Sequence, residues 1–246
     1  MTLSLETLLN LNHLFIRNCE NIKCLSSSKV LPNLVDIEIR ECPEFVSFPR
    51  EGLSAPNLTS LYVSRCLNLK SLPCHANTLL PKLERMTISN FLEMETFPEG
   101  GMPPSLRSLY IRNCEKLMRS SSITSMSMLI HLSIGGPCDG VKSFSNGGLV
   151  LLPPSLTSLD LFQMSILLTL ECRGLFHLPS LEVLRKIDCP KLENMSGERL
   201  PASLIQLEIY KCPLLEERCR MKHPQTWPKV AHIRRIEVNY KWIQQD

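Results

Sequence analysis

The residues with the clearest potential for chemistry are the cysteines. Six of the eleven cysteines occupy one position of a repeated pattern: Cys19, Cys42, Cys66, Cys114, Cys189 and Cys212. A structural metal site needs four convergent ligands. Here successive members are expected one strand apart in a single row, and no histidine or second cysteine completes a tetrahedral set. We therefore predict no metal site, but buried, reduced thiols that reach the carbonyls of the loop after each strand.

The sequence offers no other constellation typical of catalysis. It contains no HExxH, GxSxG or EF-hand pattern, and its six histidines are scattered without a fixed aspartate or cysteine partner. We predict that the chain is not an enzyme and that it needs no cofactor.

The cysteine column belongs to a longer frame, Leu-x-x-Leu-x-Ile-x-x-Cys, that occurs nine times with some variation. Its opening leucines are 23 to 27 residues apart. They are Leu11, Leu34, Leu58, Leu83, Leu106, Leu129, Leu156, Leu181 and Leu204. This spacing lies within the period of leucine-rich repeats. Leu-x-Ile is typical of a short strand with alternate side chains pointing inward, and one such unit cannot bury its own apolar edge.

Stacking these units predicts an α/β fold, a leucine-rich-repeat solenoid or horseshoe. One parallel β-sheet would line the concave face, and short irregular or helical segments the convex face. We expect a single domain over residues 1–246 with about nine repeats over 11–218. A C-terminal cap is expected over 219–246, and an N-terminal cap is expected to be absent.

The expected cap contains several apolar residues. Ile233, Ile236 and Val238 are predicted to form a final strand, and Trp227 and Trp242 to cover the last apolar layer. These assignments close the core at the C-terminal end.

Two departures from a simple repeat stand out. In the eighth repeat, Lys186 occupies a position that should be aliphatic. A local bulge that turns Ile187 inward would resolve this conflict. The second departure is a longer period, because even-numbered repeats continue into a Phe or Met followed by a glycine turn, as in Phe48–Leu53 and Met195–Leu200.

The outward positions of the strands are the candidate binding residues, since they face solvent on the concave side. In the first five repeats, aromatic residues alternate there with arginines, the side chains that most often anchor protein interfaces. The candidate protein-binding residues are Phe15, Arg17, Arg40, Tyr62, Arg65, Arg85, Arg107, Tyr110 and Arg112. The alternative is a solvated sheet face without a partner.

Charge and hydropathy exclude other functions. The net charge of +3 is spread along the chain, and Glu38, Glu41 and Glu84 lie among the arginines, where they would repel phosphates. We therefore predict no nucleic-acid partner. With no signal peptide and no apolar span, we expect no membrane contact and a cytoplasmic location, which reduced cysteines also favour.

The repeat motif, the Phe-Pro-x-Gly-Gly loop and the closing Trp227–Ile233 segment resemble the C-terminal repeats of plant disease-resistance proteins, the nucleotide-binding leucine-rich-repeat receptors of the coiled-coil type. The resemblance implies a non-catalytic module for pathogen recognition and autoinhibition in innate immunity, cut from a larger receptor. It also implies a protein partner: a pathogen effector, a guarded host protein or the receptor's own nucleotide-binding domain.

The alternative is a substrate adaptor of an F-box type ubiquitin ligase, because F-box proteins also carry cysteine-containing leucine-rich repeats. That class usually continues Cys-x-x-Ile-Thr-Asp-x-Gly, whereas this chain has continuations such as Pro43-Glu44-Phe45.

Overall fold

The computed structural model describes residues 1–91, 94–97, 101–118, 121–137, 143–144 and 152–245. Its contacts divide the chain into two compact units, Met1–Leu129 and Ile130–Asp246. Each unit is described by itself below.

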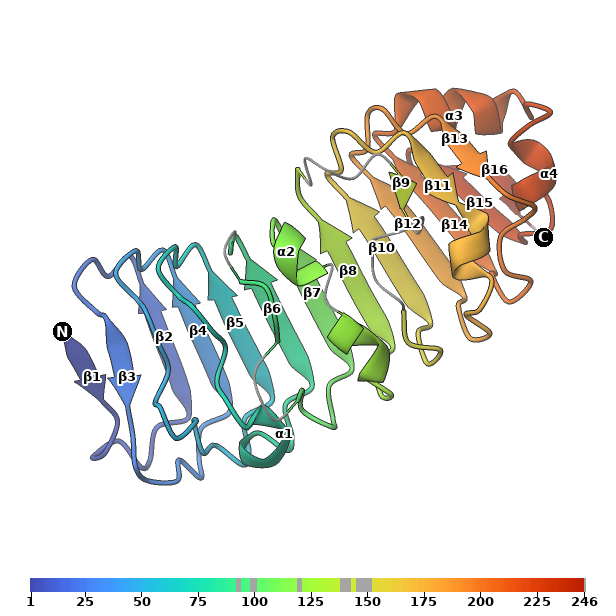
Figure 1. Cartoon of the computed structure of the whole chain (residues 1–246). Coiled ribbons are helices and arrows are strands. Elements are labelled where there is room, and N and C mark those ends of the chain that lie inside the picture. Colours follow the sequence, from blue (N-terminus) through green and yellow to red (C-terminus); the bar gives the residue numbers. More distant parts are fainter. Residues whose placement is uncertain (92–93, 98–100, 119–120, 138–142, 145–151, 246) are drawn as a thin grey trace. The chain divides into compact units, whose positions relative to one another are not determined.

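Unit 1 contains a sheet of five parallel strands (Figure 1). In spatial order they are β2 (His13–Arg17), β4 (Asp36–Arg40), β5 (Ser60–Ser64), β6 (Arg85–Ser89) and β7 (Ser108–Arg112). Equivalent residues of successive repeats pair in register, so that Leu14, Ile37 and Leu61 form one row. A second parallel pair joins β1 (Thr2–Ser4) to β3 (Cys24–Ser26), and the helical segments are α1 (Ala76–Leu79), α2 (Glu115–Met118) and η1 (Ser121–Ser125).

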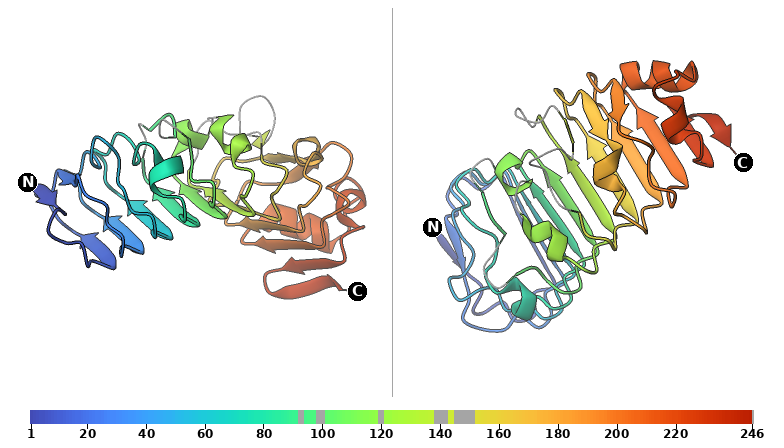
Figure 2. Two further views of the ribbon diagram at one scale, coloured as in Figure 1. Left: turned by 90° about the horizontal axis from the view of Figure 1, so that it is seen from below. Right: turned by 45° about the vertical axis from the view of Figure 1, so that its right-hand side comes forward.

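Unit 2 repeats the same design. Its parallel strands are β8 (His131–Gly135), β10 (Ser158–Phe162), β12 (Val183–Ile187), β14 (Gln206–Tyr210) and β15 (Arg235–Val238), and β16 (Lys241–Gln245) adds an antiparallel edge. A smaller parallel sheet holds β9 (Ser143–Phe144), β11 (Thr169–Glu171) and β13 (Asn194–Ser196), with helical segments η2 (Cys172–Leu175), α3 (Pro213–Arg220) and α4 (Trp227–Val230). In Figure 2, α1 and η2 lie among the segments that connect the strands, away from the sheet of their unit.

The core of each unit lies between its sheet and these connecting segments. Eight of the nine opening leucines are buried, and Leu11 is half-buried. The inward strand residues, such as Ile39 and Leu159, are fully buried as well. The predicted solenoid of parallel strands is therefore confirmed. The single-domain assignment and the absence of an N-terminal cap stay predictions.

The turn after each parallel strand of the two larger sheets starts in a similar way. The residue that follows the strand adopts a positive φ in Asn18, Glu41, Arg65, Asn90, Asn113, Gly136, Gln163, Asp188, Lys211 and Asn239. One residue later, the cysteine thiol donates back to a strand carbonyl, as from Cys42 Sγ to Arg40 O at 3.1 Å and from Cys114 Sγ to Arg112 O at 3.2 Å. Five of the six thiols are buried as predicted and Cys19 is half-buried, but the acceptors are the last carbonyls of the strands and not those of the following loops. Sequence reasoning missed the left-handed residue.

The left-handed turn predicts a stabilising substitution at Lys211, which adopts φ 52°. Asparagine tolerates this region better than lysine does, and the chain already uses it at four equivalent turns. Lys211→Asn should raise the free energy of unfolding by up to about 1 kcal/mol in urea denaturation. Lys191→Asn, at an exposed position outside these turns, should change it little. Equal effects of the two substitutions would contradict this explanation.

The predicted bulge in the eighth repeat is wrong. Lys186 pairs in register with Leu161 and Ile209, and its side chain is fully buried between the two neighbouring repeats. Ile187 stays on the opposite side of the strand and is half-buried. The in-register pairing on both sides of β12 keeps its side chains alternating between the core and the outer face. Lys186 therefore stays at its inward position and is buried. Burial lowers the pKa of Lys186 from 10.5 to about 8.

This buried lysine predicts a pH-dependent stability. Below about pH 8 the folded chain holds a buried ammonium ion, so Lys186→Met should stabilise it by about 3 kcal/mol, the free energy that corresponds to the lowered pKa. Between pH 8 and 10.5 the unfolded chain binds more protons at Lys186, so the stability of the unmodified chain rises with pH. Urea denaturation at pH 7 and pH 10 should show a larger advantage of Lys186→Met at pH 7. An advantage independent of pH would contradict the assignment.

The C-terminal segment differs in part from the expected cap. Ile236 and Val238 are buried in β15, and Ile233 is buried just before that strand. Trp227 is half-buried in α4, with Lys222 Nζ 4.9 Å from the centre of its ring. Trp242, on the edge strand β16, pairs with Glu237. Glu237 lies between the buried Ile236 and Val238 and on the opposite side of β15, so the prediction that this tryptophan covers the last apolar layer is wrong.

Candidate protein-binding face

The structure places the predicted binding residues along the sheet of unit 1. Seven of the nine lie at outward strand positions: Phe15, Arg17, Arg40, Tyr62, Arg85, Tyr110 and Arg112. Arg65 instead occupies the left-handed turn after β5, and Arg107 immediately precedes β7. The face therefore has a central part on the strands and two arginines just outside them.

Four predicted residues meet around a carboxylate. Arg17 donates two hydrogen bonds to Glu38, from Nε to Oε1 at 2.7 Å and from Nη2 to Oε2 at 2.8 Å. Arg40 Nε lies 2.5 Å from the same Oε1 atom. The Arg40 guanidinium stacks 4.0 Å from the centre of the Tyr62 ring, and that of Arg17 lies 5.5 Å from the Phe15 ring. These five residues are the Glu38 cluster.

The register of the strands explains this arrangement. Phe15, Glu38 and Tyr62 are paired positions on neighbouring strands, and Arg17 and Arg40 form the next outward row. The carboxylate is thus within reach of both guanidinium groups. The hydrogen bonds from Arg17, together with the charge of Arg40, lower the pKa of Glu38 below its ordinary value.

An aromatic and acidic pair extends the cluster at its N-terminal edge. The His13 ring stacks on Phe15 with the ring centres 6.0 Å apart, and His13 Nδ1 lies 2.8 Å from Asp36 Oδ2. Phe15 nevertheless stays 57% exposed. An exposed phenyl ring between an imidazole and a guanidinium is a suitable contact for an apolar side chain of a partner.

The remaining predicted residues lie in other surroundings. Arg65 Nη1 is 2.6 Å from Glu41 Oε1, so this pair joins two consecutive turns. Arg85 lies 4.0 Å from Glu84. Tyr110 shares a row with Thr87 and Tyr62, and burial raises its pKa. The structure therefore does not merge all nine residues into one basic patch.

Sequence reasoning treated Glu38 and Glu41 only as charges that oppose phosphate. In the structure each is the direct partner of predicted arginines. The signal was present, because a glutamate stands at the outward position next to an arginine in the adjacent repeat. The Glu38 cluster still holds two guanidinium groups for one carboxylate, so it keeps a positive charge.

Unit 2 shows the opposite arrangement on its own sheet. Arg185 lies between two carboxylates, with Nη1 3.2 Å from Asp160 Oδ1 and Nε 3.0 Å from Glu208 Oε2. Ser133 donates to Asp160 at 2.7 Å, and Tyr210 donates to Glu237 at 3.0 Å. This acidic row was not predicted as a functional feature.

Both units thus contain in-register parallel strands, leucines that point into the core, and a turn after the strand that begins with a residue of positive φ. The chain is a leucine-rich-repeat solenoid.

The chain is 34% identical over 235 residues to an Arabidopsis thaliana protein named "Putative disease resistance protein". The match covers 93% of this chain and 16% of that relative, so the leucine-rich-repeat chain spans a small part of the relative's length. No protein-family model matches the chain. The resemblance to plant disease-resistance proteins, inferred from the motifs, is confirmed by this relative.

In the described part of the solenoid, no group of three or more histidine, cysteine, aspartate or glutamate residues is placed to hold a metal ion. Across the same residues, no helix has the length and apolar character required to cross a membrane.

The Glu38 cluster predicts a stability effect that depends on pH. Glu38→Gln removes the negative charge between Arg17 and Arg40 and should lower the free energy of unfolding at pH 7 by less than about 1 kcal/mol. Because the pKa of Glu38 is lowered on folding, its contribution is complete above pH 4.5 and is lost as the pH falls through the folded-state value.

The measurement is urea denaturation of Glu38→Gln and the unmodified chain at pH 7 and at pH 3. The difference between them should shrink at pH 3. Glu44→Gln is the control, because the ion pair of Glu44 with Lys23 is long, at 3.8 Å, and exposed. A difference that stays constant between the two pH values would exclude the ionic role of Glu38.

Proposed function

We propose that the chain is a non-catalytic protein-interaction module that acts in plant defence as part of a longer receptor. The support is the similarity to the Arabidopsis thaliana relative, whose name refers to disease resistance and which extends far beyond the matched region. This similarity favours a defence role over the alternative of an F-box substrate adaptor.

The docking surface in this proposal is the Glu38 cluster together with Tyr110 and Arg112 on β7, which is two strands from Tyr62. Arginine and aromatic side chains dominate the binding free energy of protein interfaces. Arg40 is held in place by its contacts with Glu38 and Tyr62, so little side-chain entropy remains to be lost on binding. This preformed arrangement is the observation that carries the proposal.

The chemistry of the face suits an acidic protein surface. Two guanidinium groups share one carboxylate in the Glu38 cluster, which leaves capacity for further carboxylate oxygens. The partner would be a pathogen effector, a guarded host protein or the nucleotide-binding domain of the same receptor, and pathogen recognition and autoinhibition would use this one face.

The proposed location is the cytoplasm. The ten described cysteines are all free, and six of them donate a hydrogen bond from the thiol to a strand carbonyl. A reducing compartment maintains this state.

The binding prediction concerns the triple substitution Arg17→Ala, Arg40→Ala and Arg112→Ala. It should weaken co-precipitation with the receptor's nucleotide-binding domain at least about tenfold, since each interfacial anchor typically contributes more than 1 kcal/mol. Thermal melts should show that the variant stays folded, because these three side chains lie outside the apolar core.

Two controls separate binding from folding. Arg234→Ala removes an exposed arginine far from the face in sequence and should leave binding unchanged. Leu61→Ala removes a buried side chain and should cost roughly 2 to 5 kcal/mol of stability, with loss of binding as a consequence. The proposal fails if the folded triple variant binds as well as the unmodified chain.

A further inference from the structure

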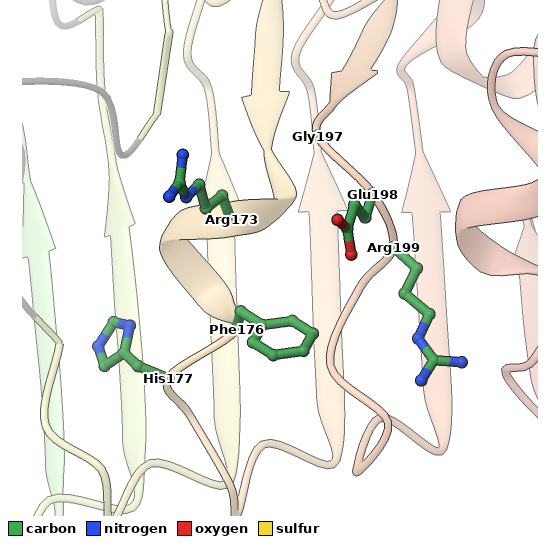
Figure 3. Close-up of a pocket in the computed structure, with 6 residues that line it drawn as sticks. All are labelled: Arg173, Phe176, His177, Gly197, Glu198 and Arg199. Carbon is green, nitrogen blue, oxygen red and sulfur yellow. The ribbon is translucent and has the colours of Figure 1, made fainter.

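A pocket of about 610 Å³ lies in unit 2 between the segments that follow β11 and β13 (Figure 3). It is lined by Arg173, Phe176, His177, Gly197, Glu198 and Arg199. Its volume is in the range of small-molecule and peptide side-chain sites. The glycine turn singled out in the sequence forms one wall, and η2 with the residues after it forms the other.

The walls of the pocket are anchored in the core. On one side, Leu175 and Leu178 are fully buried and flank Phe176 and His177. On the other side, Met195 and Leu200 are buried and flank the glycine turn. His177 Nε2 also lies 3.2 Å from Leu152 O. The pocket is therefore formed before any ligand binds.

Gly197 has a specific role in this geometry. It adopts φ +88°, and a Cβ atom built on it would lie 3.4 Å from the backbone nitrogen of Arg173. A side chain at this position would strain the turn because of the positive φ, although its Cβ atom would make only an ordinary van der Waals contact with η2. The glycine is therefore suited to the conformation of the turn that forms this wall.

The pocket combines exposed apolar surface with available positive charge. Phe176 is 59% exposed, and its ring lies between the two walls in Figure 3. Arg173 and Arg199 are both exposed, and neither guanidinium makes an ion pair or a side-chain hydrogen bond within the described residues. Glu198 is the one carboxylate among the lining residues that the structure describes, and with Arg173 and Arg199 these residues carry a net positive charge.

We propose that this pocket is a second docking site, which binds an acidic peptide segment of a partner protein. Carboxylate side chains of the segment pair with Arg173 and Arg199, because guanidinium groups bind carboxylates through two parallel hydrogen bonds. An apolar side chain between the carboxylates packs on Phe176. The site lies in unit 2 and shares no residue with the face proposed above, so it stands on separate evidence.

The test uses a fluorescein-labelled decapeptide in which Asp and Glu residues flank one central Phe, together with its Asn and Gln counterpart. Fluorescence anisotropy with the 246-residue chain at about 0.15 M salt should show binding of the acidic peptide at submillimolar concentration, and about tenfold weaker binding of the neutral one. The double substitution Arg173→Glu and Arg199→Glu should weaken the acidic peptide at least about tenfold.

A matched control has the same change of net charge elsewhere in unit 2: Lys191→Glu with Arg234→Glu, both at exposed positions. It should change binding less than about twofold, since exposed charges outside the pocket are screened by salt. Phe176→Ala should weaken binding through loss of the apolar contact, with an unchanged thermal melt because the ring is exposed.

Several results would overturn the proposal. The first is that the acidic peptide does not bind at concentrations up to about 1 mM. The second is that the matched control weakens binding as much as the double substitution does. The third is that binding survives the double substitution. Binding of a phosphoserine peptide in place of the carboxylate peptide would assign the pocket to a different ligand. Because the Glu38 cluster is itself proposed to bind acidic surfaces, every variant of this test also carries Arg17→Ala, Arg40→Ala and Arg112→Ala, so that the binding measured belongs to the pocket.

Discussion

In-register pairing of parallel strands is the interaction on which both units depend. A single repeat has an apolar strand edge that it cannot bury alone, and the neighbouring repeat supplies the missing surface. Because equivalent positions pair, each row of the sheet contains the same position from every repeat. In each unit, the rows that point inward consist mainly of leucine and isoleucine and form the core. The outward rows bring together side chains that are more than twenty residues apart in the sequence.

The same pairing decides what happens where the pattern is broken. From the sequence, a bulge at Lys186 was the expected way to keep a charge out of the core, because the burial of an ammonium ion is costly. In the structure, β10 and β14 both pair with β12, and a bulge would break the register on two sides. The fold therefore retains the buried lysine with a lowered pKa. Local sequence reasoning could not weigh this tertiary constraint, although it correctly predicted the strand itself.

The candidate face shows a similar limit. Strand spacing sufficed to place Phe15, Arg17, Arg40 and Tyr62 on one surface, because alternation along a strand is a simple geometric rule. Spacing did not reveal which charges would pair across strands. Glu38 stands beside Phe15 and Tyr62 and binds the arginines of its own and the neighbouring repeat. A list of residue types overstates the free positive charge of this face, and only the register shows how much of it is balanced.

The glycine turns extend the argument from the sheet to the connecting segments. Gly52, Gly101 and Gly197 adopt nearly the same φ, between 88° and 92°, so the turn is a constant element of the repeats in which it is described. The surroundings of the turn vary. At Gly52 a Cβ atom would lie 2.7 Å from Cys74 O, so the neighbouring segment closes tightly against the turn, whereas at Gly197 the nearest atom is 3.4 Å away and a pocket lies beside it. Phe48, before the first of these turns, is buried, while Phe176 beside the third is exposed. A scaffold that repeats its backbone but varies the side chains around it can place a binding site on its connecting segments without changing the packing of its core.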